Sequence, residues 1–155
     1  MGKPDPRNPL HLLAFGLGTG FVPKAPGTAG TLLGIPLFLL MSDLPLTGYL
    51  ALVALFFVLG IPLCARVSRD LGVHDHGGIV WDEVVGFLVT MTAAPSGLLP
   101  LVLGFLLFRL FDILKPWPIR ALDRRVGGGL GIMLDDLVAG VFAAVALQFV
   151  LYLIG

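Results

Sequence analysis

Two pairs of adjacent acidic residues stand at the edges of apolar segments. Asp82 and Glu83 lie in "GIVWDEVVGFL", and Asp135 and Asp136 lie in "GIMLDDLVAG". Ionisable groups at membrane depth are costly and usually mark a functional site. Carboxylates that lie together repel one another unless a cation intervenes, and oxygen-only donors favour a hard ion such as Mg²⁺. The four acids therefore predict a magnesium site.

The helical spacing around these acids predicts that the two pairs meet. Asp82 aligns with Gly86, and Asp136 with Gly140, four residues further along a helix. Small residues at this spacing allow two helices to approach closely. The alternative is that acids in the first turn of a helix merely complement its dipole.

One loop has the composition of an anion site. In "FGLGTGFVPKAPGTAGT", Lys24 lies among glycines, and Thr28 and Thr31 begin an apolar run. Backbone amides and these hydroxyls could bind a phosphate at a helix start. The segment matches neither the P-loop nor the dinucleotide fingerprint, so a flexible loop is the alternative.

A second basic cluster follows in "FRLFDILKPWPI". Arg109 and Asp112 share a helix face, and Lys115 lies one turn further, before the prolines stop the helix. An internal salt bridge and a role in substrate binding are both compatible with this spacing.

The histidines and the cysteine give no metal motif. His74 and His76 flank Asp75 without the spacing of a zinc helix such as His-Glu-x-x-His, so loop solvation or hydrogen bonds to Asp75 are expected. His11 receives no functional role. Cys64 is the single cysteine, so it forms no internal disulfide and is expected to be a packed apolar residue.

The composition is that of a membrane protein. Of 155 residues, 57% are hydrophobic and 13% charged, against about a quarter charged in soluble domains. The net charge of zero gives no indication of nucleic-acid binding. The polar, proline-rich N-terminus resembles neither a signal nor a transit peptide, and Pro6 argues against myristoylation.

Five apolar segments predict the fold. They run over residues 28–41, 46–65, 79–94, 97–111 and 137–154. The second and fifth are long enough to span a membrane, whereas the others are shorter than the ~20 residues required, and the first, which contains Pro36, could be re-entrant. We expect an all-α integral membrane helical bundle of four to five transmembrane or re-entrant helices, forming one domain over residues 1–155.

If successive apolar segments alternate in direction, most of the charged residues fall on one side of the membrane. The connections at 42–45 and 94–97 then share one side with the C-terminus, and all ten Lys and Arg residues lie on the other. The positive-inside rule makes that side cytoplasmic. Every acid except Asp43 lies there too, which predicts a polar site on the cytoplasmic face.

Four motifs carry a family resemblance. In order along nearly the whole chain, "PKAPGTAGT", "DHGGIVWDEVVG", "FRLFDILKPWPI" and "GGGLGIMLDDLVAG" resemble phosphatidylglycerophosphatase A of bacterial inner membranes. The resemblance implies a multi-pass, Mg²⁺-dependent phosphatase that converts phosphatidylglycerophosphate to phosphatidylglycerol and inorganic phosphate, the last step of phosphatidylglycerol synthesis. The family's motif positions fall on Asp75, Asp82, Glu83, Asp112, Asp135, Asp136, Lys24, Arg109 and Lys115.

Other phosphatase designs lack their motifs here. A Cys-x5-Arg loop would need Arg where Asp70 stands, and no Asp-x-Asp pair opens a strand. We therefore expect direct, metal-assisted attack by water. The expected catalytic residues are Glu83, Asp136 and Asp75, the metal ligands Asp82, Glu83, Asp135 and Asp136, and the substrate-binding residues Lys24, Thr28, Thr31, Arg109, Asp112 and Lys115. Either Glu83 or Asp136 is the general base, and ligand and base are interchangeable at this stage.

Two other classes of function explain fewer of these features than a phosphatase does. A small ion or proton transporter would also use membrane-edge carboxylates, but it should carry polar groups through the depth of the membrane, where these segments are apolar. A scaffold subunit leaves both acidic pairs unexplained. The expected partners are phosphatidylglycerophosphate and the lipid bilayer, with no nucleic acid and no predicted oligomeric state.

Overall fold

The structure is a computed structural model that describes residues 2–155 and contains helices but no strand in that range. The elements are α1 (Pro9–Ala14), the 3₁₀ helix η1 (Gly16–Phe21), α2 (Pro26–Met41), α3 (Leu46–Leu71), α4 (Trp81–Thr90), α5 (Leu98–Leu114), α6 (Ile119–Arg125) and α7 (Gly128–Ile154). The predicted all-α class is confirmed. The five predicted apolar segments correspond to α2, α3, α4, α5 and α7.

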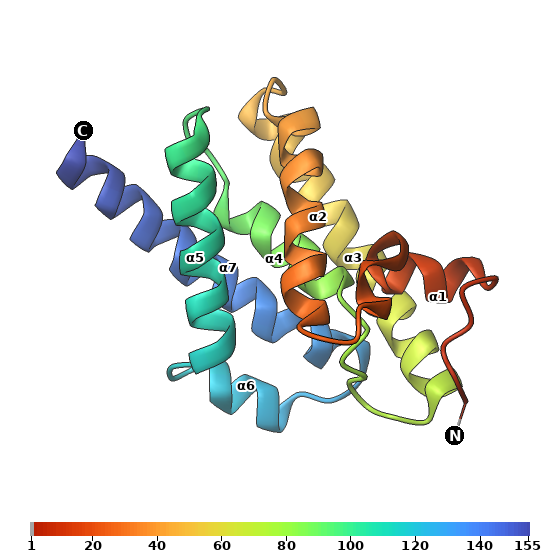
Figure 1. The fold of residues 1–155 in the computed structure, drawn as a ribbon. Helices are drawn as coiled ribbons and strands as arrows, with labels where there is room; N and C mark the ends of the chain where they lie inside the picture. The colour runs from red at the N-terminus through yellow and green to blue at the C-terminus, as the bar shows by residue number, and fades with distance from the viewer. Residues whose placement is uncertain (1) are drawn as a thin grey trace.

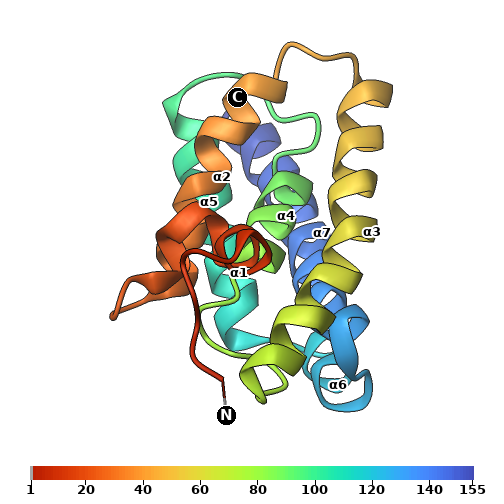
Figure 2. The same cartoon turned by 90° about the vertical axis from the view of Figure 1, so that its right-hand side faces the viewer.

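Helix α4 lies in the middle of the bundle, in contact with α2, α3, α5 and α7 (Figure 1 and Figure 2). Its side chains Phe87 and Leu88 are fully buried. The Tyr49 hydroxyl of α3 donates to the Leu88 carbonyl, and the Trp81 indole donates to the Phe56 carbonyl at 3.1 Å. Ten residues span about 15 Å, so α4 is an internal helix that cannot cross a bilayer by itself.

Helices α3 and α7 are the two helices within residues 2–155 that are long and apolar enough to cross a membrane, with 26 and 27 residues. Their outer faces expose apolar side chains, among them Val58 on α3 and Val145 on α7. Exposed apolar surface of this kind marks contact with lipid or protein rather than water. Together with the two long apolar helices, it suggests a membrane protein. Helices α2 and α5 have 16 and 17 residues, so the predicted four to five spans stay a prediction.

The chain reverses direction between successive long helices, which is the arrangement assumed above to assign the charges to one side. The α2–α3 and α4–α5 connections lie at the same end of the bundle as the C-terminus (Figure 1). The N-terminal segment, α6 and the loop between α3 and α4 lie at the opposite end. All the polar segments predicted to form a site therefore share one end.

Helix α7 begins at Gly128, well before residue 137, where the predicted apolar segment 137–154 starts. A glycine in this first part of α7 allows close packing against α3. A Cβ on Gly129 would lie 1.9 Å from the Ile61 carbonyl of α3, so only glycine lets α7 pass there. As a consequence, Asp135 and Asp136 lie inside α7, whereas the sequence places them at the edge of the predicted apolar segment.

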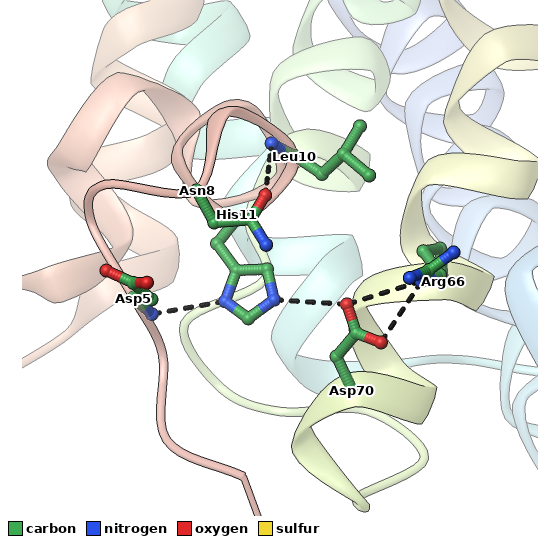
Figure 3. Close-up of polar contacts among 6 residues, drawn as sticks. All are labelled: Asp5, Asn8, Leu10, His11, Arg66 and Asp70. Atoms are coloured by element: carbon green, nitrogen blue, oxygen red, sulfur yellow. Dashed lines mark hydrogen bonds and ion pairs between the residues drawn. The ribbon is translucent and has the colours of Figure 1, made fainter.

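The buried side chain of His11 connects α1 to α3 through a hydrogen bond (Figure 3). Asn8 caps α1, and the Asp5 backbone N–H donates to His11 Nδ1 at 3.1 Å. His11 Nε2 therefore carries the proton and faces an Asp70 carboxylate oxygen at 3.3 Å. Arg66 donates to the same carboxylate at 3.1 Å, so this network ties the N-terminal segment to the end of α3.

Candidate active site

Three carboxylates from two helices meet at the polar end of the bundle. Asp82 and Glu83 of α4 and Asp136 of α7 each place one carboxylate oxygen within 4.8 Å of the others. A Cβ on Gly140 would lie 2.5 Å from the Gly86 carbonyl, so α4 and α7 touch backbone to backbone. Because each aspartate lies one turn before its glycine, this contact brings the acidic pairs together, as the spacing predicts.

The three carboxylates are largely buried, and each has an oxygen without a hydrogen-bond partner among the described residues. Asp82 is 5% exposed and Asp136 2%. Asp82 Oδ1, Glu83 Oε2 and Asp136 Oδ2 have no hydrogen-bond partner among the described residues. Buried carboxylates without donors repel one another and are stabilised by a cation. Their all-oxygen chemistry fits a hard divalent ion, so these residues suit the predicted Mg²⁺.

A chain of ion pairs links α5 to α7. Arg109 donates to Asp112, and Lys115 Nζ lies 3.9 Å from Asp112 and 2.8 Å from Asp135. Burial lowers the pKa of Lys115, but the hydrogen bond and charge of Asp135 outweigh burial and raise it. The salt-bridge interpretation of Arg109 and Asp112 is therefore confirmed. Asp135 is the partner of Lys115 and lies outside the group of three, so its role as a metal ligand stays a prediction.

The start of α2 and the guanidinium of Arg109 flank Glu83. A Cβ on Gly27 would lie 3.0 Å from Glu83 Oε1 and 3.3 Å from Arg109 Nη1. Arg109 Nε is buried and donates to no described acceptor. An unpaired guanidinium donor and the N-terminus of a 16-residue helix thus lie beside the carboxylates, where a phosphate could accept hydrogen bonds.

Gly27 is the residue that sequence analysis missed. Its neighbours Lys24 and Thr28 were identified, but a lone glycine after proline gives no signal of side chains that approach it from other helices. The only indication is its place in the first turn of α2, where a small residue leaves room for a ligand.

The three residues of this segment that were predicted to bind phosphate have different surroundings. Thr31 is fully buried and donates to the Gly27 carbonyl at 2.7 Å, so its proton is used inside α2. Thr28 is half-buried in the first turn. Lys24 is exposed in the preceding loop and makes no ion pair with a described residue. Substrate binding by all three stays a prediction.

Asp75 lies on the loop between α3 and α4. The residue as a whole is exposed. Even so, the protein around its carboxyl and the charge of Asp135 raise its pKa to about 6. This carboxyl therefore exchanges its proton closer to neutral pH than an ordinary aspartate.

The two histidines of the same loop hold the backbone. His74 Nε2 accepts a hydrogen bond from the Gly128 N–H at 3.1 Å, and His76 Nδ1 accepts one from the Gly78 N–H at 2.9 Å. These bonds replace the expected hydrogen bonds to Asp75. His74 thereby connects the loop to the first residue of α7.

Cys64 is buried, as predicted, and its thiol lies 3.8 Å from the Met133 sulfur. This contact joins α3 to α7 beneath the acidic cluster. The cysteine acts as a small apolar packing residue.

Known proteins resemble this chain over most of its length. The family described as "Phosphatidylglycerophosphatase A" matches residues 12–151, a range that contains every residue of the acidic cluster. The chain is 50% identical over 144 residues to "Phosphatidylglycerophosphatase A" of Escherichia coli (strain K12), covering 92% of this chain and 84% of the relative. It is 47% identical over 150 residues to the protein of the same name from Haemophilus influenzae, covering 94% and 90%. No solved structure matches the chain. The chain belongs to the phosphatidylglycerophosphatase A family.

Proposed function

We propose that this protein is a Mg²⁺-dependent lipid phosphatase that hydrolyses phosphatidylglycerophosphate to phosphatidylglycerol and inorganic phosphate. One observation carries the proposal: Asp82, Glu83 and Asp136 gather within 4.8 Å, with unpaired oxygens beside the free donor of Arg109. The family membership supports the same substrate, since its relatives are named for it.

In this proposal the carboxylates bind the metal and Arg109 binds the phosphate. Asp82, Glu83 and Asp136 would hold the metal, with Asp135 as a further candidate. When bound, Mg²⁺ supplies a Lewis acid for a phosphoryl oxygen and lowers the pKa of water. Arg109 donates to the phosphate oxygens, while Asp112 fixes the orientation of its guanidinium.

Water attacks the phosphorus directly in this proposal. A bond forms between the water oxygen and phosphorus, and the bond from phosphorus to the glycerol oxygen breaks. Glu83 or Asp136 accepts the proton of the attacking water. Asp75, with a pKa of about 6, is suited to protonate the departing glycerol oxygen.

The proposed location is the bacterial inner membrane, with the site facing the cytoplasm. Helices α3 and α7 meet the length and composition of spanning helices. Arg69 at the end of α3 and Arg124 and Arg125 at the end of α6 belong to the polar end of the bundle. The positive-inside rule puts that end in the cytoplasm.

No described feature favours the transporter over the phosphatase. The carboxylates gather at one end, and beyond them the interior of the bundle is formed by apolar side chains such as Phe87, Met91 and Leu147. A proton pathway would need polar groups along the depth of the bundle.

The test is product analysis with the purified protein in mixed micelles containing phosphatidylglycerophosphate. We expect equal amounts of phosphatidylglycerol and inorganic phosphate with Mg²⁺, no release with EDTA, and recovery when Mg²⁺ is restored. A folded protein that releases no phosphate with any divalent metal would contradict the proposal.

A further inference from the structure

A narrow apolar groove runs along the outside of the bundle between α2 and α5. It has a volume of about 240 Å³. Leu32 and Ile35 of α2 line one wall, and five residues of α5 line the other: Leu98, Leu101, Val102, Phe105 and Leu106. The two helices lie side by side and run in opposite directions (Figure 1).

The groove opens outward, away from the core. Leu32 is 51% exposed, Val102 45% and Leu106 57%. The five residues of α5 recur at intervals of three and four, so they form one continuous stripe on the face toward α2. From Leu98 to Leu106 this stripe is about 12 Å long.

Both walls of the groove end in polar residues at the proposed site. On α5, Arg109 lies four residues after Phe105 and continues the same stripe. On α2, Thr28 lies four residues before Leu32. Gly27, next to Thr28, is the residue beside which Glu83 and Arg109 lie. The groove is thus apolar along its length, and Arg109 and Thr28 follow on the same two helices, toward the acidic cluster.

We propose that this groove binds an acyl chain of the phospholipid whose terminal phosphate is hydrolysed. The inference rests on the proposed function and adds where the acyl chain of the substrate is held and from which side the substrate enters the site. A molecule with an apolar tail and an anionic head matches the groove and Arg109 together. A lipid held in this way reaches the site sideways from the bilayer, between α2 and α5.

The larger apolar cavity on the other side of the bundle lacks this continuity. Its volume is about 610 Å³, and its lining residues come from α1, α3 and Trp81. None of the residues lining it lies on α2 or α5, where Gly27 and Arg109 stand. It serves as the comparison site in the experiment.

The first arm of the test is photo-crosslinking with phosphatidylglycerophosphate that carries a diazirine on one acyl chain. We expect labelling concentrated in residues 32–35 and 98–106, reduced by excess unlabelled phosphatidylglycerophosphate and unaffected by phosphatidylcholine with the same chains. Labelling that is uniform over the bundle, concentrated near Phe56 and Trp81, or displaced equally by both lipids would overturn the inference. This arm does not depend on turnover, so it stands apart from failure of the proposed function.

The second arm fills the groove. Val102→Trp should raise KM for long-chain phosphatidylglycerophosphate about tenfold, the equivalent of losing two buried methylene groups, with kcat little changed. Val58→Trp is the matched control, because Val58 is 58% exposed on α3 and lines no groove on this side. Equal KM values for the two variants, both with wild-type unfolding midpoints, would overturn the inference.

Discussion

A carboxylate oxygen of Asp82 on α4 and one of Asp136 on α7 lie within 4.8 Å of each other, although the two residues are 54 positions apart in the chain. One turn further along each helix, the backbones of Gly86 and Gly140 touch. The separation of the two carboxylates therefore depends on a contact between two glycines.

Gly140→Ala should separate α4 from α7 and disable the site. The new Cβ would meet the Gly86 carbonyl at 2.5 Å and Val89 at 3.0 Å, and overpacking of this kind costs about 1–3 kcal/mol. We expect a lower unfolding midpoint together with loss of phosphate release. Gly48→Ala is the control, because its Cβ would meet only ordinary contacts at 3.6 Å in α3. Equal behaviour of the two variants would argue against the glycine contact as the positioning element.

Gly27→Ala should impair activity more than stability. The added Cβ reaches Glu83 Oε1 at 3.0 Å and Arg109 Nη1 at 3.3 Å, so both side chains must shift by a few tenths of an ångström. Displacements approaching 1 Å in a catalytic site cost up to about 100-fold in rate, and we expect roughly tenfold here. The measurement is kcat/KM beside the unfolding midpoint. An unfolding midpoint that falls while kcat/KM holds would show that Gly27 is structural only.

Lys115→Met should destabilise the fold, and Asp135→Asn should relieve the effect. Removing the amine leaves the buried Asp135 carboxylate without its 2.8 Å partner. Loss of one member of a fully buried pair costs about 3–5 kcal/mol, and because Lys115 is 27% exposed we expect about 1–3 kcal/mol. A double-mutant cycle on the unfolding free energy measures the coupling. Additive effects of the two substitutions would contradict this pairing.

Asp75 should make stability fall as the pH rises from about 4 to 6. Its pKa is raised from 3.8 to about 6, so in this window the folded state binds the proton that the unfolded state has released. Burial is the largest cause of the raised pKa; among the charged groups, Asp135 and Asp123 raise it, and His74 and Lys115 lower it. Unfolding measured in EDTA should show a smaller fall for Asp75→Asn than for wild type. Identical pH profiles would show that Asp75 is not perturbed.

The meeting of the acidic pairs was predictable because it follows from helical spacing. Asp82 with Gly86 and Asp136 with Gly140 form the same pattern on two segments, and small residues at that spacing pack closely. The position of the Arg109 guanidinium in the site was not predictable from the sequence. Arg109 was identified, but its position beside Gly27 results from the packing of α2 against α4 and α5, which no local pattern encodes.

The wrong start of α7 has a physical explanation. Glycine lowers helix propensity, so the run before Leu134 is typical of a connection in an isolated peptide. In the folded chain, Gly129 packs against the Ile61 carbonyl of α3 so closely that no side chain fits, and this contact outweighs propensity. Tertiary packing of this kind lies outside any prediction based on local composition.

The carboxylates of α4 and α7 are proposed to form a metal-dependent phosphatase site. The most direct measurement is kcat for phosphate release from phosphatidylglycerophosphate by wild type, Asp82→Asn and Asp43→Asn at saturating Mg²⁺. Asp43 is an exposed aspartate at the opposite end of the bundle, so it controls for loss of one acidic charge. We predict a loss of at least about 100-fold for Asp82→Asn with an unchanged unfolding midpoint, and wild-type activity for Asp43→Asn. Full activity in a folded Asp82→Asn variant would show that Asp82 has no part in the reaction and would refute the proposed metal site.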